Sequence, residues 1–293
     1  MILYVFIASL FQSILAYKPV ILIHGVLSDA GHLNDLKNLI QTSHPGTNVT
    51  LVKLYPEVES FVPLQHQLEY WLKKVDVIFE NSPEGVHLIC HSQGGLICQG
   101  IIEYCDEHSV HTFIALSSPL NGQFGVPSLI AHYMPWLNGS RESLTKYMYT
   151  TIAQDTFAIS NYWRDPRDEY QSKYVSTVRY LPVIQNNPKS RKYIPQEAAR
   201  HKRNFLKLKK LVLIGGPDDG VITPWQSSLF GFYDDQLNIS NMKNQSVFLN
   251  DWFGLRTLYE RGNVSSYAIR GVKHVDWHGN PFVFHKAIEP WLD

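Results

Sequence analysis

The sequence has no excess of charge of either sign and no basic stripe interleaved with aromatic residues. Its 26 lysine and arginine residues balance 26 aspartate and glutamate residues, so the formal net charge is zero. Nucleic-acid binding depends on cations that neutralise phosphates, so we expect no nucleic acid among the partners. The chain also lacks internal repeats, low-complexity tracts and heptad runs. With 293 residues, 44% of them hydrophobic, it is predicted to form one globular domain with an elaboration.

The N-terminal apolar run is too short to span a membrane, which takes about 20 apolar residues. It covers residues 1–16, is interrupted by Gln12 and has small residues at Ser13 and Ala16, although no Lys or Arg precedes it. We interpret residues 1–16 as a cleaved signal peptide, residues 17–293 as the mature chain, and we expect no stable membrane span. Glycosylation sequons support entry into the secretory pathway and lie at Asn48, Asn138, Asn238, Asn244 and Asn263.

Apolar runs rich in β-branched residues alternate with segments of helical period. The runs cover residues 19–23, 49–54, 86–90, 112–116, 211–214 and 266–269, and residues 63–79 show a helical apolar stripe. This alternation predicts a mostly parallel sheet flanked by helices. Residues 120–208 are rich in aromatics and lack a clear buried strand. We predict that they form a helical cap over the carboxyl edge of the sheet; ordinary surface helices are the alternative.

A nucleophile elbow is indicated at Ser92. The serine follows the apolar run 86–90 and precedes Gly94, Gly95 and an apolar helical segment, with Cys90 where the G-x-S-x-G motif has its first glycine. Small residues are needed there because strand and helix approach each other closely. A serine that merely caps a helix would not explain the glycine pair. The sequence therefore predicts an α/β-hydrolase fold with Ser92 as the nucleophile, and the adjacent His91 is interpreted as structural.

Two main-chain N–H groups are expected to form the oxyanion hole. One follows the nucleophile and belongs to Gln93, and the other belongs to Val26, in the loop after the strand that ends in His24-Gly25. Because both donors are main-chain groups, the identity of the side chains matters little. For His24 itself, the alternative to a role in the site is a buried, hydrogen-bonded core histidine.

The acid and the base should follow the serine in chain order, each in a loop beyond the carboxyl end of a strand. Residues 211–219 supply a strand, a turn and two adjacent acids, of which Asp219 is favoured over Asp218. The loop after the last strand supplies His274, with His278 as its competitor. Asp219 would orient the imidazole of His274 and stabilise the imidazolium, while the other ring nitrogen takes the proton from Ser92.

The three cysteines leave one unpaired in an oxidising compartment. Cys98 and Cys105 are seven residues apart on one predicted helix, roughly 10 Å along its axis, which is too far for a disulfide. Cys90 ends the strand against which that helix packs, and Cys98 lies early in the helix. We therefore predict a Cys90–Cys98 disulfide, with three buried free thiols as the alternative.

Three strings carry a family resemblance that extends over essentially the whole mature chain: ICHSQGGLIC (89–98), GGPDDGVITPWQSSLFGFY (215–233) and FGLRTL (253–258). With them the chain resembles the palmitoyl-protein thioesterases. The resemblance implies a lysosomal enzyme that hydrolyses fatty-acyl thioesters, such as long-chain acyl-CoA or S-acylated peptides, without metal or organic cofactor. It places the triad at Ser92, Asp219 and His274. A glycan-dependent lysosomal sorting receptor is then an expected partner.

The residues alone leave rival functions open. Nothing in them distinguishes a thioester from an oxygen ester, so a lipase, a carboxylesterase or an acyltransferase with the same triad is the first alternative. A binding module that keeps only the shape of the fold is the second, although such proteins usually lose a triad member. The aromatic segment 120–208, which includes Tyr133 and Trp136, is expected to hold the acyl chain.

Overall fold

The computed structural model describes residues 17–126 and 140–293. The predicted signal peptide, the sequon at Asn138, and Tyr133 and Trp136 lie outside the described residues. Within the described ranges, no helix is both long enough and apolar enough to cross a bilayer.

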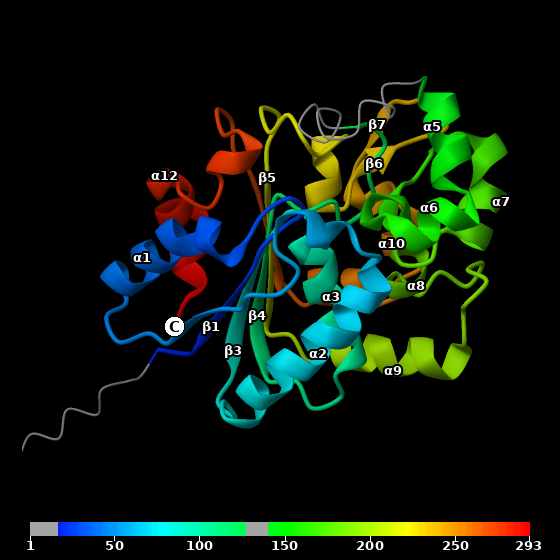
Figure 1. Ribbon diagram of the computed structural model, residues 1–293. Coiled ribbons are helices and arrows are strands. Elements are labelled where there is room, and N and C mark those ends of the chain that lie inside the picture. The colour runs from blue at the N-terminus through cyan, green and yellow to red at the C-terminus, as the bar shows by residue number, and fades with distance from the viewer. Residues whose placement is uncertain (1–16, 127–139) are drawn as a thin grey trace, which may run out of the picture.

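Six parallel strands form one sheet in the order β2-β1-β3-β4-β5-β8 (Figure 1), which confirms the predicted fold class. The last strand begins two residues earlier than predicted, because β8 lies at the edge and its half-exposed side chains interrupt the apolar pattern. The strands are β1 Val20–Ile23, β2 Val49–Leu51, β3 Val86–His91, β4 Val110–Leu116, β5 Lys210–Gly215 and β8 Val264–Ala268.

Helices cover both faces of the sheet, which is why its central strands are apolar on both sides. Alternate side chains of β1 enter two different cores: Ile21 and Ile23 the first, Val20 and Leu22 the second. The first core lies under α2 (Leu64–Glu80), α3 (Gly94–Tyr104) and α9 (Pro195–Phe205). The second lies under α1 (Asn34–Ser43) and α12 (Pro281–Val283), on the opposite face (Figure 1).

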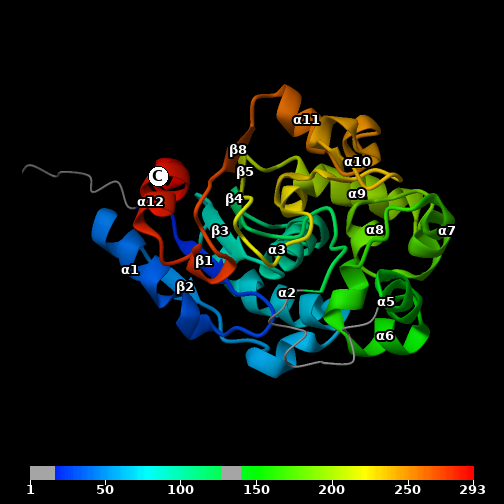
Figure 2. The same cartoon turned by 90° about the horizontal axis from the view of Figure 1, so that it is seen from above.

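Two long connections leave the sheet on the α3 side. The connection from β4 to β5 carries α5 (Arg141–Met148), α6 (Thr151–Thr156), α7 (Asp168–Thr177), α8 (Leu181–Ile184) and then α9, which packs along α3. The connection from β5 to β8 carries β6 (Phe232–Tyr233), β7 (Ile239–Ser240), α10 (Ser246–Leu249) and α11 (Leu255–Glu260). Figure 2 shows that these helices lie on the side of the molecule away from α1 and α12.

Candidate active site

Ser92 lies in a tight turn between β3 and α3. Its φ of 55° is in the left-handed region, which is the strained backbone expected of a nucleophile elbow. A Cβ on Gly94 would lie 2.6 Å from the main-chain oxygen of His24, and one on Gly95 would lie 2.1 Å from the hydroxyl of Ser118. Strand and helix therefore approach so closely that only glycine fits at both positions.

The structure brings the three predicted side chains from three different loops into one hydrogen-bonded line. His274 Nε2 lies 2.8 Å from Ser92 Oγ, and His274 Nδ1 lies 2.9 Å from Asp219 Oδ2. The main-chain N–H of His274 also donates to the carbonyl oxygen of Asp219 at 2.9 Å. All three residues are buried. This geometry allows a proton to pass from the serine hydroxyl to an imidazole held by a carboxylate.

The carboxylate of Asp219 accepts further hydrogen bonds that the sequence reasoning did not anticipate. Ser117 Oγ and Trp277 Nε1 donate to Oδ2 at 2.6 and 2.7 Å, and the main-chain N–H of Ile222 donates to Oδ1 at 2.7 Å. Burial by itself would raise the pKa of Asp219, but the hydrogen bonds, led by that from His274, outweigh burial and hold the pKa well below its usual range. Asp219 therefore stays ionised.

Asp218 and His278, the alternatives to Asp219 and His274, do not lie in the hydrogen-bonded line with Ser92. Asp218 Oδ2 accepts the main-chain N–H of Gly271 at 2.8 Å, so it braces the loop that carries His274. The ring of His278 contacts that of His91 at 5.3 Å between centroids, and no hydrogen bond joins it to Asp219 in the described residues.

His91 contacts His274 through both its ring and a hydrogen bond. Its Nε2–H donates to the carbonyl oxygen of His274 at 3.0 Å, and the two rings lie 4.8 Å apart. Burial holds the pKa of His91 well below its usual range, which favours the neutral ring. The residue interpreted as structural thus holds the main chain of His274.

The loop after β1 lies directly against the serine. A Cβ on Gly25 would lie 2.6 Å from Ser92 Cβ, which explains the glycine at this close approach. The buried ring of His24 sits between the carbonyl oxygens of Gly25 and Leu54, at 2.9 Å from each, as expected for a hydrogen-bonded core histidine. Among the described residues, none accepts a hydrogen bond from the main-chain N–H of Val26 or Gln93.

The side chain of Gln93 ties the elbow to two other segments. Its Nε2 donates to the carbonyl oxygen of Ser60 at 3.0 Å, and its Oε1 accepts from Tyr162 Oη at 3.2 Å. Ser60 in turn accepts from the main-chain N–H of Leu27 at 2.8 Å. Sequence reasoning assigned Gln93 only a main-chain role, since its side-chain partners come from distant segments.

The predicted disulfide between Cys90 and Cys98 is confirmed. The two Cα atoms lie 6.5 Å apart, within the range that a disulfide can bridge. The bond joins the end of β3 to the first turns of α3 and so closes the elbow covalently. Cys105 is a half-buried free thiol, and burial raises its pKa.

A group of side chains able to hold a metal lies at the opposite end of the sheet. His87, His111 and Asp293 place their ligand atoms within 4.8 Å of one another. The carboxylate of Asp293 is already paired with Lys18 at 2.8 Å and with His87 at 3.0 Å. His87 and His111 lie near the starts of β3 and β4, whereas Ser92 follows the end of β3, so this group is remote from the elbow.

The parallel sheet and the strained serine elbow define an α/β hydrolase. A lipase from Bacillus licheniformis, BlEst2 in its mature form, has a similar fold, with a TM-score of 0.53 and 15% identity over 95% of this chain and 93% of that one. The family model described as palmitoyl protein thioesterase matches residues 19–274.

Curated relatives agree with the family model. The Xenopus laevis protein named lysosomal thioesterase PPT2-B is 44% identical over 94% of this chain and 93% of its own. The Rattus norvegicus lysosomal thioesterase PPT2 is 43% identical over 94% of this chain and 88% of its own. The chain belongs to the palmitoyl protein thioesterase family, a family of acyl thioesterases.

Proposed function

We propose that the protein hydrolyses fatty-acyl thioesters through an acyl-enzyme intermediate on Ser92. The observation that carries the proposal is the line of hydrogen bonds from Ser92 Oγ through His274 to Asp219, at 2.8 and 2.9 Å, in the elbow of a thioesterase-family chain. The substrate class comes from the family, whereas the assignment of roles rests on the geometry.

In the first half of the reaction, Ser92 Oγ attacks the acyl carbonyl carbon while His274 Nε2 accepts the hydroxyl proton. The ionised Asp219 stabilises the imidazolium that forms. When the tetrahedral intermediate collapses, the carbon–sulfur bond breaks and the thiolate leaves with the proton from His274. In the second half, His274 activates water, which releases the fatty acid and regenerates Ser92.

The oxyanion of both tetrahedral intermediates would be held by the main-chain N–H groups of Gln93 and Val26. Both groups are free of acceptors within the described part of the chain, and both belong to segments adjoining Ser92. Removing one donor from such a hole typically costs about 10²–10³ in kcat. The contacts of the Gln93 side chain with Ser60 and Tyr162 would keep this part of the site preorganised.

The acyl chain is proposed to lie against the helical segment between β4 and β5, which we propose forms a cap. The described part of this segment is rich in buried aromatic side chains, including Tyr149, Tyr162 and Trp163. Burying each methylene group contributes about 0.8 kcal/mol, so such a site would produce selectivity for chain length.

We also propose that the protein is a lysosomal glycoprotein, made with the signal peptide 1–16. Similar proteins bear the name lysosomal thioesterase. Asn48, Asn238 and Asn244 are exposed, and Asn263 is half-buried, so these sequons are accessible to different degrees. A glycan on them would supply the signal for a lysosomal sorting receptor.

The test compares Ser92→Ala with Ser228→Ala, a control in which a buried serine hydroxyl with no hydrogen-bond partner in the described residues is removed. Rates with matched palmitoyl thioester and palmitoyl oxoester substrates, and labelling by a fluorophosphonate, are measured for both variants and the wild type. We expect Ser92→Ala to lose about 10⁴-fold or more in kcat and all labelling, while the control keeps both.

Each alternative function predicts a different result. Faster turnover of the oxoester would indicate a lipase or carboxylesterase. Transfer of the acyl group to an added alcohol in preference to water would indicate an acyltransferase. Absence of fluorophosphonate labelling in folded wild-type protein would overturn the enzymatic proposal and favour a binding module.

A further inference from the structure

A cavity of about 980 Å³ lies apart from Ser92, between the two long connections that leave the sheet. Its lining comes from Arg164, α7, the segment after α8, α10 and Trp252. Figures 1 and 2 both place α7, α8 and α10 together on the side of the molecule away from α1 and α12. The lining includes none of Ser92, Asp219 and His274, nor any residue that hydrogen-bonds to their side chains.

A half-buried guanidinium without a counter-charge lines this cavity. Arg164 donates through Nη1 to the main-chain and side-chain oxygens of Asn121, at 3.1 and 2.7 Å, and through Nη2 to Gln245 Oε1 at 3.2 Å. Its guanidinium carbon lies 4.5 Å from the ring centre of Phe232. These partners are neutral, and no carboxylate in the described residues pairs with the group. Arginine remains charged even where burial lowers its pKa, as burial does here.

The guanidinium keeps two donors unused. Of its five N–H groups, three are taken by the bonds to Asn121 and Gln245, which leaves Nε–H and one Nη2–H without an acceptor in the described ranges. Nε and Nη2 form one edge of the group, and a carboxylate or a phosphate placed at this edge can accept from both nitrogens. Partial burial of a cation without a counter-charge is costly, and an anion at the site would offset that cost.

The rest of the lining is polar for the most part and includes a few apolar side chains. Val175, Val247 and Trp252 supply apolar surface. Tyr174 also lines the cavity, and its buried hydroxyl has no hydrogen-bond partner in the described residues. At the rim, the exposed Asp168 and Lys189 offset each other in charge, so Arg164 determines the sign of the site.

We propose that this cavity is a binding site for an amphiphilic anion, whose carboxylate or phosphate meets the open edge of Arg164 while its apolar part lies against Val175, Val247 and Trp252. The site is distinct from the elbow and does not depend on the hydrolase activity.

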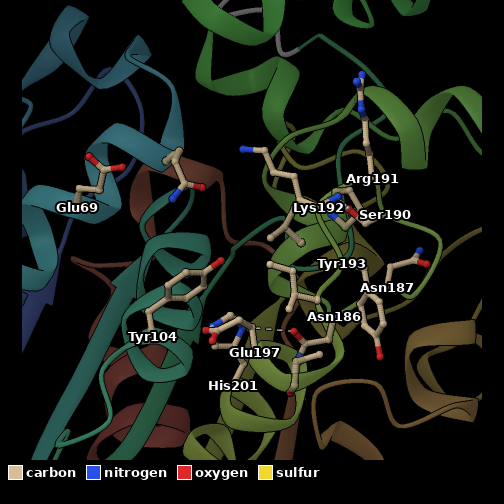
Figure 3. Close-up of a pocket in the computed structure, with 15 residues that line it drawn as sticks. Glu69, Tyr104, Asn186, Asn187, Ser190, Arg191, Lys192, Tyr193, Glu197 and His201 are labelled. Atoms are coloured by element: carbon tan, nitrogen blue, oxygen red, sulfur yellow. Dashed lines mark hydrogen bonds and ion pairs between the residues drawn. The ribbon is translucent and has the colours of Figure 1, made fainter.

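A second cavity, of about 590 Å³, lies between α2, α3 and the start of α9 (Figure 3). It differs from the first cavity in the charged groups of its lining. Figure 3 shows Tyr104 beside Glu197 and His201 at this cavity. Their groups are already partnered: His201 stacks on Tyr104 at 4.1 Å, and Glu197 accepts from Arg200 at 2.6 Å. The other charged residues of the lining, Glu69, Arg191 and Lys192, are exposed, so no half-buried charge among the described residues marks this cavity as a site.

Calorimetric titration of the full chain with three probes tests the proposal: octanoate, octyl phosphate and the uncharged octanol. We expect at least one of the two anions to bind, and octanol to bind at least tenfold more weakly than that anion. Binding of octanoate alone would indicate a site for carboxylates, and binding of octyl phosphate alone a site for phosphate esters. Equal affinity for octanol would overturn the proposal, because the charge would then play no part.

Variants locate the binding. Arg164→Lys keeps the charge but loses the paired donors, and it should weaken anion binding about tenfold. Asp168→Asn removes the rim acid and should strengthen binding about twofold. Because Asp168 is exposed at the start of α7, Asp168→Asn tests the proposal even if Arg164→Lys does not fold. Lys192→Gln is the control: it removes a cation outside this cavity and should leave the affinity unchanged.

Ser92→Ala separates this site from the elbow. Anion binding that persists in Ser92→Ala and falls in Arg164→Lys supports the proposal whether or not the protein is a thioesterase. Binding lost in Ser92→Ala but unchanged in both Arg164→Lys and Asp168→Asn would place the anion at the elbow and overturn the proposal. Failure of every probe to bind would also overturn it.

Discussion

The burial of Glu103 in α3 leads us to predict that the stability of the protein depends on pH. Its side chain is fully buried, its Oε1 accepts from Gln99 Nε2 at 2.9 Å, and its Oε2 has no partner in the described part of the chain. Burial raises the pKa of Glu103 well above the ordinary value of 4.5, and the hydrogen bond from Gln99 offsets only part of this effect. The folded protein therefore keeps the proton to a higher pH than the unfolded chain does.

The sign and the size of the effect follow from proton linkage. Because the pKa is raised in the folded state, the stabilisation is fully present below about pH 4.5 and is lost as the pH rises toward the folded pKa. Each pH unit over which only the unfolded chain is ionised costs about 1.4 kcal/mol of unfolding free energy. Between pH 5 and pH 7, integration from the ordinary value gives a loss of at most about 2.6 kcal/mol.

The perturbation is Glu103→Gln, which keeps the shape of the neutral acid and cannot ionise. Urea unfolding at pH 5 and pH 7 gives the free energy of unfolding of variant and wild type at each pH. Burial lowers the pKa of His87 and of His108 to about 4, so these rings destabilise the fold as the pH falls below about 6.5. This opposite trend cancels when the wild type is compared with the variant.

We expect the variant to gain stability relative to the wild type as the pH rises from 5 to 7, by up to about 2.6 kcal/mol. Glu107→Gln, at an exposed acid just beyond α3, is the control and should show no such change. Equal pH dependence of Glu103→Gln and the wild type would refute the reasoning, because it would mean that Glu103 ionises alike in the folded and unfolded states.

Three further predictions concern the elbow and the surroundings of Asp219. Cys98→Ser should lower the free energy of unfolding, measured by urea unfolding, by about 2–3 kcal/mol in the chain-entropy model. As a check, the variant should be as stable as wild-type protein whose disulfide has been reduced with dithiothreitol. Gly94→Ala should lower the free energy of unfolding by about 1–3 kcal/mol and remove most of the activity, because the added Cβ would lie 2.6 Å from the main-chain oxygen of His24. Gly279→Ala, whose Cβ meets nothing nearer than 3.4 Å, should be neutral, and equal losses in both would contradict the steric argument. Trp277→Phe removes the 2.7 Å bond to Asp219 and should lower kcat about tenfold with little change in KM; an unchanged kcat would show that this donor is dispensable.

The local parts of this protein were predictable from the sequence by itself. The apolar runs indicated a parallel sheet, because a strand covered on both faces must be apolar on both. The serine elbow was recognisable because strand, turn and helix are consecutive in the chain. Small residues are needed around Ser92 because the strand and the helix approach each other closely there. Cys90 and Cys98 could be paired for the same reason, since eight positions separate them within one strand–turn–helix unit.

Tertiary structure alone decided which distant groups meet. The sequence offered Asp218 beside Asp219 and His278 after His274, and only the folded loops bring Asp219 and His274 to the serine. Ser117 and Trp277 bear no motif that could have predicted their bonds to Asp219. The open edge of Arg164 likewise depends on segments far apart in the chain. Hydrogen bonds and uncompensated charges of this kind depend on how separate elements pack, which residue order and local periodicity do not specify.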